Sequence, residues 1–306
     1  MTSPLTPPFQ DQVRPFQVEG LDVRGRIVRL GPLLDDMCRG HDYPAPVRAL
    51  LGEVAALALV LASALKYDGI FTLQIQGSGP VGLVVVDVTS AGDMRGHARF
   101  DAARLAGLGD IAAAPVPRLL GAGHMAFTVD QGPDTDRYQG ITGLEGATLS
   151  ECAHGYFRQS EQMETAILLA ADAATEGTHA GALMVQRLPG TAAAGADIDE
   201  DAWRRAVVLM SSLTSAELLD GGLNSETLLY RLYHEDGVRL FDLHDVRHKC
   251  RCSQGRVAQT LKSFPRAEIM ELADKDADGH SVRVDCEFCK ASYVFSEADL
   301  DALFAA

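Results

Sequence analysis

Short stretches of alternating hydrophobic and polar residues, rich in β-branched side chains, recur throughout 1–190, and this pattern predicts β-strands. Gly, Ser and Asp separate the stretches at 70–76, 81–88 and 94–100, which predicts an antiparallel meander. The stretches at 124–130 and 137–144 predict a further hairpin. The remaining predicted strands of this region are 23–30, 165–171 and 179–186.

A nearly continuous apolar stretch at residues 46–65 predicts a buried helix. Its most apolar part, 54–65, is short and follows Glu53, so we expect it to be too short to cross a bilayer. A second helix is predicted at 148–162, with Ser150 as its N-cap. The candidates for its buried face are Cys152, Tyr156 and Phe157.

Residues 189–197 contain no large apolar side chain, which predicts a linker at the end of the first domain. Helical spacing follows at 199–213, 215–219 and 225–233. The apolar faces are formed by Trp203, Val207, Met210, Leu228, Leu229 and Leu232. Three helices this short are marginal alone, so we expect them to pack on the N-terminal sheet.

The C-terminal part of the chain, 245–306, predicts a small separate fold. Ser253 is expected to cap a helix carrying Val257, Leu261 and Phe264, which Pro265 ends. Residues 281–284 and 293–295 predict a hairpin, and Ser296 is expected to cap a final helix that ends at 303–304. The predicted fold class is α+β, with an antiparallel-sheet domain with helices at 1–190, a helical middle linker at 191–244 and a small module at 245–306.

Charge and composition reduce the number of possible functions. The 306-residue chain is 47% hydrophobic and carries a net charge of -15, which argues against a nucleic-acid partner. Residues 1–244 hold 18 basic against 31 acidic side chains, whereas 245–306 hold 9 against 11. The N-terminal segment 1–8 has neither a basic start nor an apolar run, so we expect a cytoplasmic protein without a membrane partner.

The clearest chemical signal is a pair of cysteine pairs, Cys250 with Cys252 and Cys286 with Cys289, separated by the stretch 253–285. Four thiolates fill the tetrahedral coordination of zinc, so the spacing predicts one structural Zn²⁺ per chain. Catalytic zinc usually keeps a position for water, and a site closed by four sulfurs therefore argues against an enzyme. Neighbouring cations are expected to favour thiolates; they are His248, Lys249, Arg251 and Lys290.

The other two cysteines, Cys38 and Cys152, have no partner spacing and are interpreted as small apolar core residues. Two further motifs occur in the wrong context. Residues 77–82 match GxGxxG, but a strand rather than a helix should follow, so we predict a hairpin turn. Residues 274–285 nearly match a calcium loop, but Asp285 replaces the bidentate Glu, so we predict a solvated acidic turn.

Two other interpretations of the cysteines stay open at this point. One is a zinc-ribbon nucleic-acid-binding module, which the acidic net charge and the shortage of basic patches outside 247–256 disfavour. The other is a thiol oxidoreductase that uses Cys286 and Cys289. That motif usually precedes a helix in a βαβ unit, whereas here a hairpin is predicted.

Several segments together resemble a known family over most of the chain. They are Tyr138-Gln-Gly-Ile141 with Leu144-Glu-Gly146, Tyr156-Phe-Arg-Gln-Ser-Glu-Gln162, Cys250-Arg-Cys-Ser-Gln-Gly-Arg-Val257, and Cys286-Glu-Phe-Cys289 with Tyr293 and Phe295. In these segments the chain resembles the thirty-three-kilodalton chaperonins, which are bacterial redox-regulated heat-shock holdases. The spacing between the two cysteine pairs is at the long end of what that resemblance leads us to expect.

The resemblance implies a substrate-binding N-terminal domain, a helical linker packed over it and a C-terminal redox switch. It implies zinc on Cys250, Cys252, Cys286 and Cys289 in a reduced, inactive state. It further implies that oxidation forms the disulfides Cys250–Cys252 and Cys286–Cys289, ejects zinc and releases chaperone activity, typically in a homodimer. The implied partners are unfolding client proteins.

Overall fold

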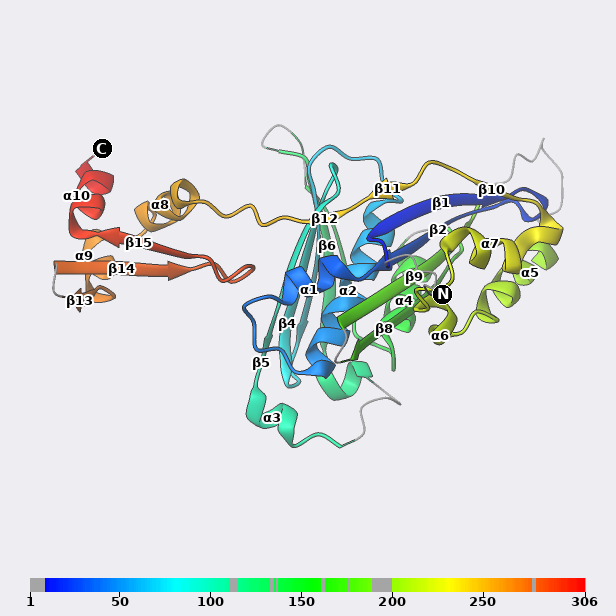
Figure 1. The fold of residues 1–306 in the computed structure, drawn as a ribbon, viewed down its shortest axis with the longest axis horizontal. Helices are drawn as coiled ribbons and strands as arrows, with labels where there is room; N and C mark the ends of the chain where they lie inside the picture. Colours follow the sequence, from blue (N-terminus) through cyan, green and yellow to red (C-terminus); the bar gives the residue numbers. More distant parts are fainter. Residues whose placement is uncertain are drawn as a thin grey trace, which may run out of the picture. The chain divides into compact units, whose positions relative to one another are not determined.

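The computed structural model describes residues 9–305 except 110–114, 133–134, 136, 161–162, 175–176, 189–199 and 277–278. The chain folds into two compact units (Figure 1). The N-terminal unit comprises the chain up to Cys38 together with Asp42–His248, and the C-terminal unit comprises Arg39–His41 with Lys249–Ala306. The linker predicted at 189–197 lies outside the described residues, and the functional division at 190 and 244 stays a prediction.

Two six-stranded sheets build the N-terminal unit. The first has the order β10–β1–β2–β9–β8, and β11 also pairs with β1. Its strands are β1 (Gln12–Val18), β2 (Val23–Leu30), β8 (Thr165–Ala174), β9 (Gly177–Arg187), β10 (Val238–Leu240) and β11 (His244–Asp245). The pairs in this sheet are antiparallel, so each strand is hydrogen-bonded to a neighbour running the opposite way.

The second sheet has the order β12–β5–β4–β3–β6–β7. Its strands are β3 (Ile70–Gly77), β4 (Val81–Thr89), β5 (Asp93–Phe100), β6 (Gly123–Asp130), β7 (Tyr138–Gly143) and β12 (Arg247–His248). It is antiparallel except where β12 pairs with β5 in parallel. The meander of β3, β4 and β5 and the hairpin of β6 and β7 are confirmed.

All eight strands predicted for this unit are present, with ends close to the predicted positions. The sequence missed β1, because Pro15 stands in its middle and proline argues against a strand. It also missed β10, β11 and β12, which are very short. All four missed strands lie at sheet edges or next to them, where the pattern of apolar residues is weakest.

The predicted core helix is α2 (Ala45–Ala62), and it contacts strands of both sheets. At 18 residues this helix extends beyond the apolar stretch 54–65 on its N-terminal side, and by length and composition it is long enough to cross a membrane. However, 72% of the helix is buried inside the protein. Its apolar character is explained by the core, where Leu51, Val54 and Leu57 are fully enclosed.

The other helices of this unit are short. They are α1 (Pro32–Cys38), α3 (Ala102–Ala106), α4 (Leu149–Ser160), α5 (Glu200–Ser211), α6 (Ser215–Leu218) and α7 (Ser225–Tyr233), with 3-10 turns at Glu19–Leu21 and His234–Asp236 and a π-helical turn at Val116–Leu120. In α4 the N-cap is not Ser150, which lies inside the helix. The hydroxyl of Thr148 instead accepts from the Glu151 amide at 3.2 Å.

The glycine-rich turn between β3 and β4 is confirmed as a hairpin. A Cβ at Gly77 would lie 2.1 Å from the Leu120 carbonyl oxygen, and one at Gly79 would lie 2.5 Å from that of Leu119. These glycines therefore allow a close approach of two backbone segments. They do not open a helix that could hold a phosphate.

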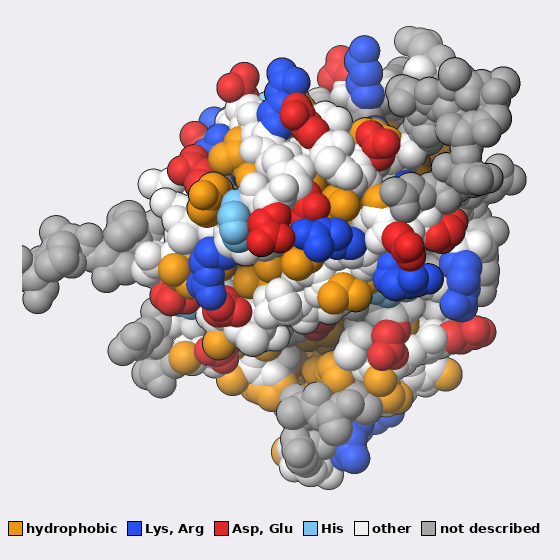
Figure 2. Space-filling view, turned by 90° about the vertical axis from the view of Figure 1, so that its right-hand side faces the viewer, with side chains coloured by type: hydrophobic (Ala, Val, Ile, Leu, Met, Phe, Trp, Pro, Cys, Tyr) orange, Lys and Arg blue, Asp and Glu red, His pale blue; other side chains and the backbone are white. Residues whose placement is uncertain are grey.

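Helices α5, α6 and α7 pack on the first sheet, as the sequence predicts. The shared core includes Phe16, Ile27 and Leu183 from the strands and Met210, Leu228 and Tyr233 from the helices. Trp203 is only partly buried, whereas Tyr233 is fully buried and is the main aromatic anchor. Figure 2 shows the outer side of this region, where acidic and basic side chains alternate with smaller apolar ones.

The C-terminal unit has its own small core, formed by Leu261, Ile269, Val282, Phe295 and Leu300. Its elements are α8 (Gln254–Lys262), α9 (Arg266–Glu271), β13 (Asp274–Asp276), β14 (Gly279–Asp285), β15 (Ser292–Ser296) and α10 (Glu297–Ala305). Ser253 and Ser296 cap α8 and α10 as predicted. The sequence missed α9 and β13.

Strand β13 contradicts the calcium-loop alternative. Asp274 and Asp276 lie in a strand that pairs with β14, with Asp274 opposite Ser281. A calcium loop needs a backbone that curls around one centre, whereas this segment is extended and paired with a neighbouring strand. Residues 277–278 of the predicted acidic turn lie outside the described part of the chain, so the turn itself stays a prediction.

Candidate metal centre

Cys250 and Cys252 lie in an extended segment just before α8. The hydroxyl of Ser253 caps this helix by accepting from the Arg256 amide at 3.3 Å. The Arg256 guanidinium in turn donates to the carbonyl oxygen of Arg251 at 2.9 Å. In extended chain the side chains of residues i and i+2 point to the same side, so the CxC spacing turns both sulfurs one way. The start of the helix holds the backbone between the two cysteines.

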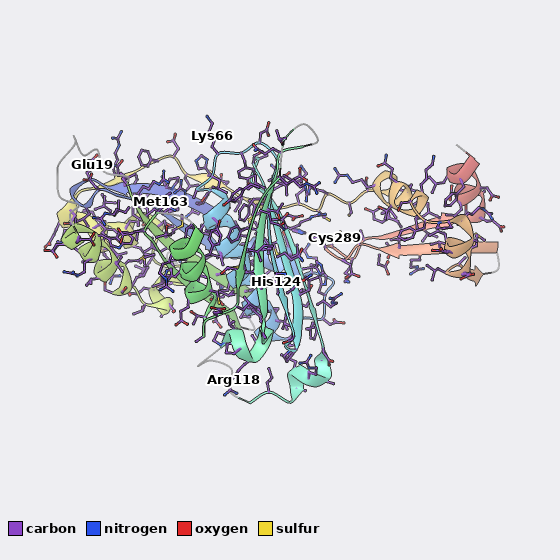
Figure 3. All side chains as sticks on the ribbon, turned by 180° about the vertical axis from the view of Figure 1, so that it is seen from behind. Glu19, Lys66, Arg118, His124, Met163 and Cys289 are labelled. Atoms are coloured by element: carbon purple, nitrogen blue, oxygen red, sulfur yellow. The ribbon has the colours of Figure 1, made fainter. Side chains whose placement is uncertain are left out.

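Cys286 and Cys289 lie in the turn between β14 and β15. Cys289 is labelled in Figure 3. The Cys286 amide donates to the Ala291 carbonyl at 2.9 Å, and the Lys290 amide donates to the Cys286 carbonyl at 2.8 Å. Lys290 has φ of 57°, in the left-handed region that non-glycine residues rarely adopt. This turn brings the two sulfurs of a CxxC motif together at the end of the hairpin.

The four sulfur atoms form one compact group, all within 4.8 Å of one another. The Sγ atoms of Cys250 and Cys286 are 3.7 Å apart, and those of Cys252 and Cys289 are 3.4 Å apart. A regular tetrahedron with Zn–S bonds of about 2.3 Å has sulfur–sulfur edges of about 3.8 Å. The arrangement therefore fits one zinc ion bound by four thiolates. All six cysteines of the chain are free thiols.

Protonation is uneven among the clustered thiols. Burial raises the pKa of Cys289 to about 12 and raises that of Cys286 as well. For Cys250 burial acts in the same direction, but the Cys252 amide and the neighbouring thiols outweigh it and lower the pKa to about 7. Without a cation, the group thus favours one thiolate, and binding of a divalent ion would displace the remaining protons.

The neighbouring cations contribute less than the sequence suggested. Hydrogen bonds, rather than cationic side chains, make the largest contributions that lower the pKa of Cys250. The ammonium group of Lys290 lies 3.3 Å from a carboxylate oxygen of Glu287. Part of the charge of Lys290 is therefore compensated by a carboxylate rather than by the sulfurs.

Tyr293 is a further residue of the centre. Its hydroxyl donates to Sγ of Cys252 at 3.0 Å. This hydrogen bond raises the pKa of Tyr293 to about 12, so the hydroxyl stays a donor at neutral pH. Metal-bound thiolates are commonly held by such donors, which orient the sulfur and adjust its basicity. The sequence offered no sign of this role apart from a tyrosine that fell within a family-like segment.

Cys38 and Cys152 stand apart from this group. Burial raises the pKa of each thiol to about 11. Cys152 is 2% exposed and packs in the core with Tyr156 and Phe157, as predicted, whereas Cys38 is partly buried against the same core. Both thiols therefore stay protonated and weakly reactive at neutral pH.

Comparison with known proteins shows which class of protein this chain belongs to. The model of the Hsp33 protein family matches residues 11–296. The 33 kDa chaperonin of Caulobacter vibrioides is 43% identical over 296 residues, covering 95% of this chain and 96% of the relative. That of Ectopseudomonas mendocina is 39% identical over 290 residues, covering 95% and 94%. These matches identify a chaperone rather than a member of a known enzyme class.

The chain belongs to the Hsp33 family. A solved structure, the 33 kDa chaperonin of Thermotoga maritima, shares its fold with a TM-score of 0.80 over 97% of this chain and 98% of that one, at 22% identity. The resemblance stated from the cysteine motifs and the α+β fold class are thereby confirmed.

Proposed function

We propose that this chaperone is a redox-regulated holdase that binds unfolding proteins under oxidative stress. In the reduced, inactive state one Zn²⁺ is held by Cys250, Cys252, Cys286 and Cys289. Oxidation forms the disulfides Cys250–Cys252 and Cys286–Cys289, releases zinc and activates the protein. The observation that carries the proposal is the group of four sulfurs within 4.8 Å of one another, contributed by two distant cysteine pairs.

Energetics explain why metal loss would act as a switch. A structural zinc contributes on the order of 10–16 kcal/mol to a small module. Among the described residues of the C-terminal unit, five hydrophobic side chains are buried in its core, and a fold this small rarely gains more than about 3–5 kcal/mol from its core. Loss of zinc should therefore unfold this unit rather than loosen it.

The sulfur distances add a geometric reason. The two contacts at 3.4 and 3.7 Å join cysteines of different pairs, whereas the proposed disulfides join cysteines within each pair. A disulfide needs a sulfur–sulfur bond of about 2.05 Å and a dihedral angle near 90°, so each pair must leave the tetrahedral arrangement to close. Oxidised and metal-bound states are therefore mutually exclusive.

Unfolding of the C-terminal unit would be transmitted to the segment before it. Helices α5, α6 and α7 cover apolar side chains of the first sheet, among them Phe16, Ile27 and Leu183. Their release would expose both this sheet face and their own apolar sides, and large apolar patches bind other proteins. The surplus of 13 negative charges on residues 1–244 would help to keep client complexes soluble.

The rival functions fit less well. A CxxC oxidoreductase needs a cysteine with a lowered pKa, but the pKa values of Cys286 and Cys289 are raised by burial. A nucleic-acid module is disfavoured by the acidic charge. The proposed setting is the bacterial cytoplasm, with a homodimer in the oxidised state, client proteins as partners, and neither nucleic acid nor membrane bound.

The test follows zinc, free thiols and client aggregation together, with the reduced and the peroxide-oxidised full-length chain. We expect one zinc per reduced chain, loss of zinc with four thiols on oxidation, and suppression of light scattering from an unfolding client only afterwards. The Cys250→Ser/Cys286→Ser variant should not retain zinc. The matched control, Cys38→Ala/Cys152→Ala, should behave as wild type.

Two results would refute the proposal. One is stoichiometric zinc in the Cys250→Ser/Cys286→Ser variant, which would place the metal elsewhere. The other is complete oxidation and zinc loss without any holdase activity in the wild-type chain.

A further inference from the structure

Residues 238–248, which we call the strap, run along the edges of both sheets in the N-terminal unit (Figure 1). As β10 and β11 the strap pairs antiparallel with β1, and as β12 it pairs in parallel with β5. It begins shortly after α7 and ends just before Cys250. One continuous segment therefore occupies the outer edge of β1 and the outer edge of β5.

The strap is held mainly by its backbone. Outside the ladder bonds, the Phe241 amide donates to the Pro15 carbonyl and the Val246 amide to the Asp11 carbonyl, each at 3.1 Å. Of the strap's side chains only that of Val246 is buried, at 8% exposure. Because backbone groups are common to all sequences, another extended chain could make the same contacts.

Between the two sheet edges the strap crosses a cavity of about 520 Å³. Strap residues 243–246 line one side of it, and the others come from β1, from the end of α2 and the segment just after it, and from the end of β4 with the turn that follows. Apolar walls include Val13, Leu59 and Val88, and Lys66, labelled in Figure 3, lies among the lining residues. The strap thus covers a hollow with mixed apolar and polar walls that it does not fill.

The end of the strap is anchored by a very short strand. β12 consists of Arg247 and His248 alone, opposite Asp93 and Met94. Its side-chain contacts include the ion pair between Arg247 and Asp93 at 2.6 Å, where Arg247 is 67% exposed. Asp93 is buried at 8% exposure, and β12 also contacts α1, so the anchor of the strap at this end is short but specific. With only two residues in β12, order in the chain that follows at Cys250 matters for keeping it in place.

We propose that the strap occupies the client site, and that an extended segment of an unfolded protein replaces it as an added strand on β1 and β5. This inference rests on the proposed function, because loss of zinc is what frees the strap. An uncovered sheet edge presents unpaired N–H and C=O groups that take up another strand. The preferred segment runs antiparallel to β1 and places an apolar side chain where Val246 lies.

This mode of binding suits a protein with many clients. Main-chain hydrogen bonds supply affinity with little regard to sequence, and the buried position of Val246 adds a preference for one apolar residue. Folded proteins lack free extended segments and are excluded. A segment with proline at the positions of Phe241 or Val246 would lack the required N–H donors.

A peptide with the sequence of residues 238–248, VRLFDLHDVRH, tests the inference directly. Added in excess to the oxidised full-length chain, it should compete with an unfolding client and remove most of the suppression of aggregation. N-methylation of its Phe241 and Val246 amides should abolish the competition. N-methylation at Asp242, in the turn between β10 and β11, is the matched control and should have little effect.

A covalent lock provides the second test, in a Cys38→Ala/Cys152→Ala background. Gln17 and Arg239 face each other across β1 and β10, so Gln17→Cys/Arg239→Cys can form a cross-strand disulfide that keeps this part of the strap in place. The oxidised, locked protein should lose zinc but suppress client aggregation at least fivefold less than its parent. Thr128→Cys/Gln139→Cys, across β6 and β7, is the control lock and should keep full activity.

The outcomes separate the two proposals. If the parent loses zinc and gains activity while the locked protein is equally active and the peptide does not compete, the strap is not at the client site, although the holdase function stands. If the parent gains no activity after zinc loss, the proposed function fails and this inference fails with it. Loss of activity in the locked protein, together with competition by the unmethylated peptide alone, supports the inference.

Discussion

The hydroxyl of Tyr233 on α7 donates a hydrogen bond to the carbonyl oxygen of Ala206 on α5, at 3.1 Å in a fully buried position. The ring of Tyr233 also lies 6.0 Å from that of Phe16 on β1 and nearly parallel to it. Helices α5, α6 and α7, which pack on the first sheet, are called the helical cover below. The side chain of Tyr233 therefore joins two helices of this cover to each other and to the sheet. Burial raises the pKa of this hydroxyl, so it remains a donor.

We predict that Tyr233→Ala loosens the helical cover, at a cost of about 3–5 kcal/mol in stability, because a large buried ring is removed. Tyr233→Phe should cost about 1 kcal/mol, the usual net value of one hydrogen bond. The rate of limited proteolysis within α5–α7 in the reduced, zinc-bound protein measures how far each variant loosens these helices. Tyr230→Ala, at a residue that is 62% exposed, is the control and should change little. An unchanged cleavage rate in Tyr233→Ala would contradict the anchor role.

A second prediction concerns the Tyr293 hydroxyl, which donates a hydrogen bond to a sulfur of the candidate metal centre. Tyr293→Phe removes the hydroxyl that lies 3.0 Å from Sγ of Cys252 but keeps the ring. Loss of a group that orients a metal ligand typically lowers affinity by about 10–100-fold. Competition with a zinc chelator gives the affinity, and the rate of zinc loss to peroxide should rise in parallel. Equal affinity of the variant and wild type would show that the hydroxyl does not support the site.

A third prediction concerns pH. Glu53 lies on α2, and burial raises its pKa to about 7 from an ordinary value of 4.5. The folded state therefore binds this proton more tightly than the unfolded state, and the contribution of Glu53 to stability falls as pH rises from about 4.5 to 7. Glu53→Gln should thus be stabilising above pH 7, by at most about 3 kcal/mol, and nearly neutral near pH 4.5.

Chemical denaturation of the N-terminal unit at pH 4.5 and pH 8 tests this sign. The exposed Glu271→Gln is the control and should have the same small effect at both pH values. A Glu53→Gln protein less stable than wild type at pH 8 would mean that the carboxylate has a stabilising partner.

The fourth prediction concerns the CxxC turn. Lys290 has φ of 57°, a conformation that costs a non-glycine residue roughly 1–2 kcal/mol. Lys290→Gly should therefore stabilise the C-terminal unit by up to about 1 kcal/mol, whereas the β-branched Lys290→Val should destabilise it. Thermal unfolding of the zinc-loaded proteins ranks the stability of wild type, Lys290→Gly and Lys290→Val.

Glu287→Gln is the control for that series, since it removes the ion pair with Lys290 and leaves the backbone conformation alone. Because exposed ion pairs contribute little, it should shift stability by less than about 1 kcal/mol. If Lys290→Gly were the least stable variant, the left-handed conformation would not be the strained feature of this turn.

The sequence alone predicted the eight regular strands of the N-terminal unit, the helices over the first sheet and the four clustered cysteines. These features follow from local signals: alternation of apolar residues for strands, helical spacing for α5 and α7, and two tight pairs of soft ligands for the centre. Capping by Ser253 and Ser296 is local in the same sense, because donor and acceptor lie within one helical turn.

Only the tertiary structure showed β1 and the strap as neighbours, because they lie far apart in the sequence and backbone pairing leaves little trace in the side-chain pattern. The same holds for Tyr293 at Cys252 and for Tyr233, rather than Trp203, as the buried anchor. Burial of a given aromatic ring depends on how the elements meet in space. The sequence determined which elements form and which chemistry they carry, and long-range packing decided which edges are covered and which groups support the sulfurs.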